Sequence, residues 1–223
     1  MAVLVGINFI MGENAGMLIF DLDGTLIDSN GVWVEVDKTF LARRGAPYTK
    51  EYYKGVAHTI LQNCAIFTKE YLGLSESCEE IIDEWMELAA GQYHHVPLKP
   101  GVREYLDRCK NAGHRMAVFT ACVPEHCQAA MESHSLQPYF EQVIYAQELG
   151  VDKRSPAIFR RVAEMLGVEP RDCVLFDDSL SACKAAKAAG MTVVGVYDPF
   201  FQDSKADMRE LCDQYISGFP DLL

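Results

Sequence analysis

The sequence has 223 residues, of which 20 are lysine or arginine and 32 are aspartate or glutamate, so the formal net charge is -12. At roughly 150 residues per domain, this length predicts one large domain or one domain that carries a sizeable insertion. The negative charge excludes a broad basic surface for nucleic acid or anionic lipid. No run approaches the roughly 18 apolar residues that span a bilayer, so we expect no membrane partner.

The N-terminus and the cysteines predict a cytoplasmic protein. Residues 1–11 are mostly apolar but lack the cationic start of a secretory signal, which argues against export. The eight cysteines form no Cys-x-x-Cys pair of the kind that binds structural zinc, so we expect reduced thiols. The sixteen residues before Met17 either add an edge strand or reflect an initiation site placed too early.

Strand and helix patterns alternate from residue 97 onward. Short, continuous apolar runs predict strands buried on both faces. The four clearest runs are 17–20, 116–119, 174–176 and 193–196, with a weaker fifth at 142–145. Helical segments between them have recognisable ends, such as the start at Ser155-Pro156 and the stop at Gly190. This alternation predicts a doubly wound, Rossmann-like α/β fold, in which helices cover both faces of a parallel sheet.

A long helical insertion interrupts this alternation after the first strand. About ninety residues separate the first two strands and contain no convincing strand pattern. We expect a helix over 32–44, a second one with apolar residues from Val56 to Tyr71 that ends at Gly73, and a third after a capping box of Ser77 and Glu80. This insertion should lie above the crevice where such sheets bind ligands. The predicted domains are a core of 1–28 and 97–223 and a helical cap of 29–96.

Two carboxylates follow the first predicted strand. Asp21 stands at the strand end, and Asp23 lies two residues later in a turn that Gly24 allows. A carboxylate held ionised beside a cation can attack phosphorus, whereas a neighbour in a turn can hold a proton, so the pair predicts a nucleophile and an acid/base partner. The alternative is a plain polar turn. A calcium-binding EF-hand is excluded, because Gly24 stands at the fourth position of the loop rather than the sixth.

A second acidic pair, Asp177 and Asp178, follows the fourth predicted strand. Because the ends of neighbouring parallel strands lie side by side, we expect the two acidic clusters to face each other. Their repulsion calls for a cation, and oxygen ligands with open water positions suit Mg²⁺. A capping role for Ser179 or Asp178 at the next helix is compatible with this magnesium site.

Thr120 and Lys153 offer groups that could bind phosphate. Thr120 ends the second predicted strand and combines a hydroxyl with the backbone donors of a helix start. Lys153 precedes the helix start at Ser155 and could place an ammonium near the same phosphate. Taken alone, Thr120 carries little weight, and a solvated side chain is the better interpretation of Lys153.

Together these segments resemble the haloacid dehalogenase superfamily. The resemblance covers nearly the whole chain, including 185–196, and the helical insertion resembles the family's first (C1) cap type. The most similar subgroup contains small-molecule phosphatases and β-phosphoglucomutases. The motifs that carry the resemblance are, in chain order, Asp21-Leu22-Asp23-Gly24-Thr25-Leu26, Thr120, Lys153 ahead of Ser155-Pro156-Ala157-Ile158-Phe159, and Asp177-Asp178-Ser179.

The resemblance implies Asp21 as a nucleophile that forms an aspartyl-phosphate, and Asp23 as general acid and then general base. It implies Thr120 and Lys153 as phosphate-binding residues. The cofactor that it implies is Mg²⁺, which offsets the repulsion between an anionic nucleophile and an anionic substrate. The implied metal ligands are Asp21, Asp177, Asp178 and the backbone carbonyl of Asp23.

The resemblance also bears on the reaction and its specificity. Family members that cleave carbon–halogen bonds lack an acid two residues after the nucleophile, so Asp23 favours phosphoryl transfer. Phosphonatases of the family carry a cap lysine where this sequence reads Gly55-Val56-Ala57-His58, and we therefore predict Gly55 and His58 as cap specificity residues. Ala121-Cys122 replaces the usual small polar pair after the phosphate-binding threonine, so phosphate binding should rely more on backbone N–H groups.

The predicted function is a Mg²⁺-dependent phosphatase of a small phosphorylated metabolite, working as a monomer or homodimer. Two alternatives stay open. A phosphomutase would use the same acids but return the phosphoryl group to a sugar, and a non-catalytic binding protein could share the fold. The complete set of Asp21, Asp23, Thr120, Lys153 and Asp178 weighs against the second alternative.

Overall fold

The computed structural model describes residues 16–56, 61–150 and 153–223. The chain divides into two compact units: Asn30–His95, here called the helical unit, and a core that joins the segment ending at Ser29 to Val96–Leu223. No helix within the described ranges is both long and apolar enough to cross a membrane.

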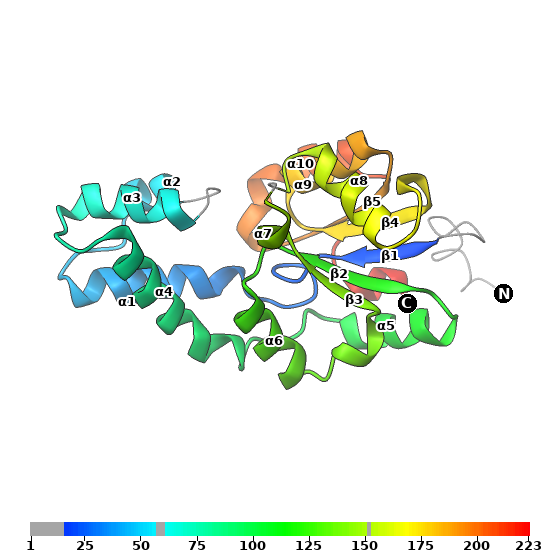
Figure 1. Ribbon diagram of the computed structural model, residues 1–223, viewed down its shortest axis with the longest axis horizontal. Helices are drawn as coiled ribbons and strands as arrows, with labels where there is room; N and C mark the ends of the chain where they lie inside the picture. The colour runs from blue at the N-terminus through cyan, green and yellow to red at the C-terminus, as the bar shows by residue number, and fades with distance from the viewer. Residues whose placement is uncertain (1–15, 57–60, 151–152) are drawn as a thin grey trace. The chain divides into compact units, whose positions relative to one another are not determined.

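The core contains one parallel sheet, in which the described residues form six strands (Figure 1). The strand order is β3-β2-β1-β4-β5-β6, and every neighbouring pair is parallel. The chain therefore extends the sheet first to one side of β1 and then to the other, and open α/β sheets bind ligands at the strand ends of such a switch point. The strands are β1 Met17–Phe20, β2 Met116–Thr120, β3 Gln142–Tyr145, β4 Cys173–Asp177, β5 Thr192–Val196 and β6 Gln214–Ile216.

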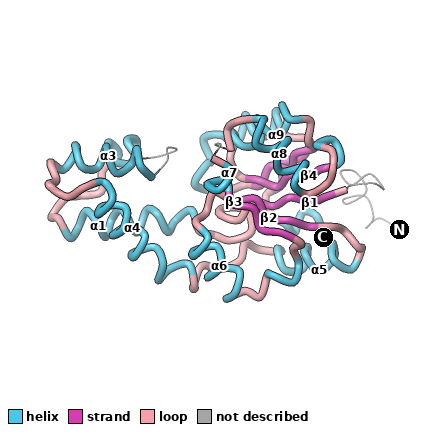
Figure 2. Tube along the Cα trace, viewed as in Figure 1, coloured by secondary structure: helices cyan, strands magenta, loops and turns pink. Residues whose placement is uncertain are grey.

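Helices cover both faces of this sheet. Those of the core are α5 Val102–Asn111, α6 Pro124–Ser133, α7 Ala146–Leu149, α8 Pro156–Met165, α9 Leu180–Ala189 and α10 Lys205–Leu211. Figure 1 shows α8, α9 and α10 on one side of the sheet and α5 and α6 on the other. Figure 2 shows the strands of the core running between these helical layers. The predicted doubly wound α/β fold is therefore confirmed.

The central strand packs on both faces, because successive side chains of a strand point in opposite directions. Met17 and Ile19 belong to one hydrophobic cluster with side chains of α8 and α9. On the opposite face Phe20 stacks on Phe176, with 4.6 Å between ring centroids, and both contact Tyr105 of α5. β1, β2 and β4 are buried along their whole length, which explains why their sequences are continuous apolar runs.

Two elements differ from the expectations drawn from sequence. The apolar pattern predicts no strand at β6, because this edge strand has three residues and only Ile216 is buried. The pattern from Val56 to Tyr71 predicts one helix, but Val56 ends one helix and Leu61 begins the next, with 57–60 outside the described residues.

The helical unit contains α1 Asn30–Arg43, α2 Lys50–Val56, α3 Leu61–Leu72 and α4 Cys78–Tyr93. The predicted capping box opens α4: the Glu80 N–H donates to Ser77 Oγ at 3.1 Å, and the Ser77 N–H donates to Glu80 Oε2 at 2.7 Å. Phe40 of α1 and Trp85 of α4 lie edge to face, with 5.5 Å between ring centroids. This aromatic contact belongs to a small apolar centre inside the helical unit.

Gly55 has a packing role inside the helical unit. A Cβ atom at this position would lie 2.1 Å from Cζ of Phe67, so α2 and α3 approach as closely as only a glycine allows. His58, the other residue expected to set specificity, lies outside the described residues, as do residues 1–15 with their possible edge strand. Both specificity assignments, and the place of the insertion above the ligand crevice, stay predictions.

Candidate active site

Three strands of the core bring polar side chains to one edge of the sheet. Asp21 follows β1 directly, Thr120 is the last residue of β2, and Asp177 is the last residue of β4, with Asp178 after it. Because β1 pairs in parallel with both β2 and β4, these side chains leave the sheet at the same edge. All four residues are buried, with 6% of the surface of Asp21 exposed and less of the others.

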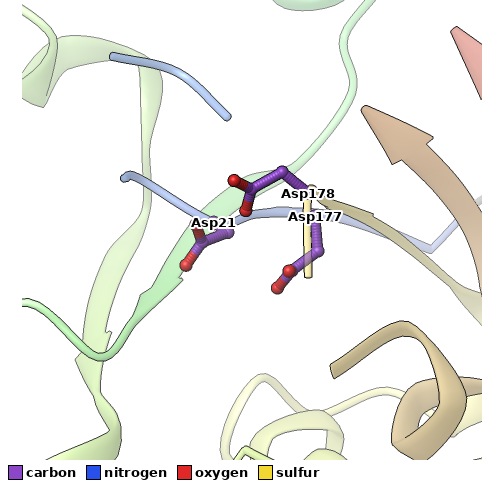
Figure 3. A group of neighbouring side chains, drawn as sticks. All are labelled: Asp21, Asp177 and Asp178. Carbon is purple, nitrogen blue, oxygen red and sulfur yellow. The ribbon is translucent and has the colours of Figure 1, made fainter. Parts of the chain in front are cut away.

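Asp21, Asp177 and Asp178 form one carboxylate cluster (Figure 3). Each contributes an oxygen that lies within 4.8 Å of the other two. The Asp21 N–H donates to the carbonyl of Phe176 at 2.9 Å, which continues the β1–β4 ladder beyond β1 and places Asp21 beside the end of β4. Like charges at such distances repel strongly in a buried site unless a cation compensates them.

Lys153 brings a positive charge to the cluster. Its Nζ donates to Asp21 Oδ1 at 2.6 Å and to Asp177 Oδ2 at 2.8 Å, and a longer bond of 3.3 Å reaches the carbonyl of Phe119. Only 12% of the lysine side chain is exposed. The interpretation of Lys153 as a solvated side chain is therefore wrong, because two buried carboxylates hold its ammonium.

Asp177 uses both of its carboxylate oxygens. Oδ2 accepts from Lys153, and Oδ1 accepts from the Ser179 N–H at 2.9 Å, which satisfies a backbone donor at the start of α9. The Ser179 side chain makes no capping bond and lies instead 3.0 Å from the hydroxyl of Ser181. The expectation that the Ser179 side chain caps this helix is thus corrected, because Asp177 accepts from the backbone there; the capping role of Asp178 stays a prediction.

Burial, repulsion and the contact with Lys153 together set the pKa of Asp21. Burial raises the pKa of Asp21 to about 7; Lys153 opposes this shift, and the charges of Asp177 and Asp23 add to it. Burial alone would lower the pKa of Lys153, but Asp177 and Asp21 outweigh that effect and raise it, so the lysine stays charged. Three carboxylates lie close together, with the ammonium of Lys153 bound to two of them. A divalent cation at the cluster would favour the anionic form of Asp21.

Thr120 presents a hydroxyl whose proton is available for a ligand. Its Oγ1 accepts a hydrogen bond from the Cys122 N–H at 2.9 Å, so the hydroxyl proton points elsewhere. The next helix, α6, begins at Pro124. The strand end thus combines a side-chain donor with the start of a helix, as the sequence predicts.

Asp23 lies on the turn after β1 and is partly exposed. Gly24 adopts a positive φ of 75°, and its N–H closes the turn on the carbonyl of Ile27 at 2.9 Å. The hydroxyl of Ser29, which is fully buried, donates to Asp23 Oδ1 at 2.6 Å and orients the carboxyl group. Sequence reasoning missed Ser29, although the serine closes the same acidic segment.

Comparison with known proteins identifies the family to which this site belongs. The family model "Haloacid dehalogenase-like hydrolase" matches residues 18–196, which include β1, β2 and β4. The chain belongs to this family. The match confirms the family that the motifs predict and the expectation of a hydrolase.

The haloacid dehalogenase-like relatives include phosphatases. A phosphorylated carbohydrates phosphatase of Thermotoga maritima is 27% identical over 78% of this chain and 81% of its own length. Protein CbbY of Rhodobacter capsulatus is 31% identical over 79% of this chain and 83% of its own. The structure of a candidate β-phosphoglucomutase from Thermotoga maritima aligns with a TM-score of 0.77 at 25% identity, covering 92% of this chain and 96% of that one.

The carboxylate cluster fits the magnesium ion that the haloacid dehalogenase-like family implies. Mg²⁺ prefers oxygen ligands, and the three carboxylates are close enough to share one ion. A divalent ion would also reduce the repulsion between these carboxylates. Asp21 and Asp178, with Asp177 beside them, are the residues that would hold it.

Proposed function

We propose that this haloacid dehalogenase-like protein is a Mg²⁺-dependent phosphatase that hydrolyses a small sugar phosphate through a phosphoryl group carried on Asp21. The observation that supports it most strongly is the contact of Asp21 with Lys153 beside Asp177 and Asp178. A lone buried carboxylate would hold a proton, whereas an ammonium and a divalent cation favour the anion. An anionic carboxylate at a strand end is a suitable nucleophile for phosphorus.

In the first step, an oxygen of Asp21 attacks phosphorus and the bond from phosphorus to the leaving oxygen breaks. Asp23 donates its proton to that leaving oxygen. Lys153 and Thr120 donate hydrogen bonds to phosphoryl oxygens; for Lys153 the long bond to the Phe119 carbonyl is the one to be exchanged. Bound Mg²⁺ reduces the repulsion between the two anions.

In the second step, Asp23 acts as a base, because it has lost its proton. It accepts a proton from a water molecule whose oxygen attacks the phosphorus of the aspartyl-phosphate. The bond between phosphorus and Asp21 breaks, which releases inorganic phosphate and restores both carboxyl groups to their starting states. The hydrogen bond from Ser29 keeps the Asp23 carboxyl group in one orientation through both steps.

The sugar-phosphate class is supported by the relatives, since one is a phosphorylated carbohydrates phosphatase. The likeness to a candidate β-phosphoglucomutase favours a phosphomutase as the second candidate function. That enzyme would return the phosphoryl group from Asp21 to a sugar hydroxyl instead of water. Product analysis separates the two, because a phosphatase releases inorganic phosphate and a mutase yields an isomeric sugar phosphate.

A panel of phosphorylated metabolites tests the proposal. We expect phosphate release from one or more sugar phosphates with Mg²⁺ and none after chelation. Asp21→Asn serves as the inactive control for contaminating phosphatases. Failure of the wild-type protein to release phosphate or to isomerise a sugar phosphate, with Mg²⁺ present, would overturn the proposal in favour of a binding protein.

We propose further that the protein acts in the cytoplasm. All eight cysteines are free thiols, which suits a reducing compartment. A monomer or a homodimer remains the expected state, and sedimentation of the full chain would distinguish them.

A further inference from the structure

Lys99 forms a buried ionic contact that the proposed reaction has not used. It lies just after the chain returns to the core, and 10% of its side chain is exposed. Its ammonium forms an ion pair with Asp198, whose side chain is 2% exposed. Nζ also donates to the carbonyl of Gly24 at 2.8 Å and to that of Tyr197 at 3.2 Å. An ammonium has three N–H donors, so these three acceptors satisfy it fully.

One of these acceptors belongs to the turn that carries Asp23. Gly24 is the next residue after Asp23, so its carbonyl moves with the backbone that aims the Asp23 side chain. A second bond joins the same segments, because the Lys99 N–H donates to the carbonyl of Leu26 at 3.0 Å. Lys99 thus holds the turn both through its backbone and through its side chain.

The other end of the contact is fixed to the sheet. Asp198 lies two residues after the end of β5, and its Oδ1 accepts from the Phe200 N–H at 2.8 Å. Its remaining oxygen, Oδ2, pairs with Lys99. Because β5 is a strand of the sheet, the ammonium is tied to a part of the core that does not belong to the turn.

We propose that Lys99, held by Asp198, is a positioning residue that fixes the backbone of the turn and thereby aims Asp23 at the leaving oxygen. The inference rests on the proposed function, since it assigns Lys99 to the proton-transfer half of that reaction. Ser29 orients the carboxyl group of Asp23 directly, and Lys99 holds the backbone beneath it. A misplacement of about 1 Å can cost a reaction roughly a hundredfold in rate, so loss of this contact should lower kcat/KM for substrates that need the proton.

A purely structural ion pair makes a different prediction. Loss of stability would lower the active fraction and reduce turnover equally for every substrate. Misplacement of a general acid instead affects poor leaving groups most, because only they need a proton as the bond to phosphorus breaks. A sugar phosphate has a poor alkoxide leaving group, whereas p-nitrophenyl phosphate releases a stable phenolate.

The experiment compares wild type with three variants: Lys99→Met, Asp198→Asn and the double variant. The two substrates are p-nitrophenyl phosphate and the most active sugar phosphate of the panel, both with saturating Mg²⁺. We expect Lys99→Met to lose about 10- to 100-fold in kcat/KM on the sugar phosphate and only a few-fold on the nitrophenyl ester, because kcat/KM reports the first step alone and both substrates share the second. Asp198→Asn, which leaves Lys99 beside Gly24, should show a smaller loss with the same selectivity.

The double variant and one additional variant, Lys187→Met, serve as controls. Lys99→Met leaves Asp198 buried and unpaired, which can unfold a protein; the double variant has no unpaired charge and should reproduce the selective loss. Lys187→Met is the matched control, since it breaks a surface pair with Asp213 at 2.7 Å and should change neither rate. Equal losses on both substrates, with the wild type active, would overturn the inference alone. A wild type inactive on both would overturn the proposed function and the inference together.

Discussion

Asp21 and Lys153 form a buried ion pair at the edge of the sheet, with 2.6 Å between Oδ1 and Nζ and with 8% and 12% of the two side chains exposed. The same ammonium contacts Asp177 at 2.8 Å. One lysine from the segment before α8 therefore stabilises the negative charges at the ends of both β1 and β4. Substitution of any one of these three residues changes the electrostatic environment of the other two.

Asp21→Asn should abolish turnover and leave the fold intact. The amide has the shape of the carboxyl group and can still accept from Lys153, but it cannot attack phosphorus. We expect kcat to fall by at least about 10³-fold and the melting temperature to stay equal or rise, because one repelling charge is gone. Asp207→Asn, an exposed position on α10, is the control. Full turnover in the Asp21 variant would remove that residue from its role.

Lys153→Met should destabilise the core. It leaves the carboxylates of Asp21 and Asp177 without their partner, and breaking a buried pair in this way costs about 3–5 kcal/mol of unfolding free energy. Addition of Mg²⁺ should recover part of the loss, because the ion restores positive charge to the cluster. Chemical denaturation with and without Mg²⁺ measures both effects. A stability loss as small as that of Lys187→Met, which should stay under about 1 kcal/mol, would contradict the account.

The sequence predicted the central strands and the meeting of Asp21 with Asp178 for one physical reason. Strands buried on both faces need continuous apolar runs, and parallel strands end at a common edge. β6 has no continuous apolar run, and no sequence pattern marks the end of α2 at Val56. Lys153 could be placed beside Asp21 only by the family resemblance, because a lone lysine is usually solvated. The contact of Lys99 with Asp198 joins residues 99 positions apart, so no local sequence pattern predicts it.

Asp23→Ala should affect substrates according to their leaving groups. On a sugar phosphate we expect kcat/KM, which reports the first step, to fall by about 10²- to 10⁴-fold, since the alkoxide leaves without a proton. On p-nitrophenyl phosphate the loss should be much smaller. Ser29→Ala removes only the hydrogen bond to the Asp23 carboxyl group. It should give a weaker loss that is again larger on the sugar phosphate than on p-nitrophenyl phosphate. Steady-state kinetics with equal losses on the two esters would count against Asp23 as the acid.

The helical unit should lose stability as the pH rises, because of Asp37. Burial raises the pKa of this carboxyl group to about 7, opposed by a weak hydrogen bond from Tyr52 at 3.4 Å. Burial raises the pKa of both Tyr48 and Cys64, and the nearby negative charge of Asp37 raises it further. An unfolded chain releases the Asp37 proton near pH 4, whereas the folded unit keeps it until about pH 7. The raised pKa therefore lowers the free energy of unfolding progressively between pH 4 and pH 7, and by a constant amount above pH 7.

Asp37→Asn removes that penalty. We expect the variant to exceed wild type in unfolding free energy by up to about 4 kcal/mol at pH 8 and to match it near pH 4. Glu35→Gln, on the same helix but exposed and paired with Lys38, should show no comparable trend. Denaturant titrations across this range provide the measurement, and a difference that does not vary with pH would rule out Asp37 as its source.

The stereochemical course at phosphorus tests most directly whether a side chain of this protein carries the phosphoryl group. The substrate is a phosphate ester in which sulfur replaces one oxygen and different oxygen isotopes occupy the other non-bridging positions, so that the phosphorus is chiral. The wild-type protein hydrolyses this ester with Mg²⁺ present. Two successive displacements, first by Asp21 and then by water, predict retention of configuration in the released phosphate. Inversion would mean a single direct attack by water and would contradict the account.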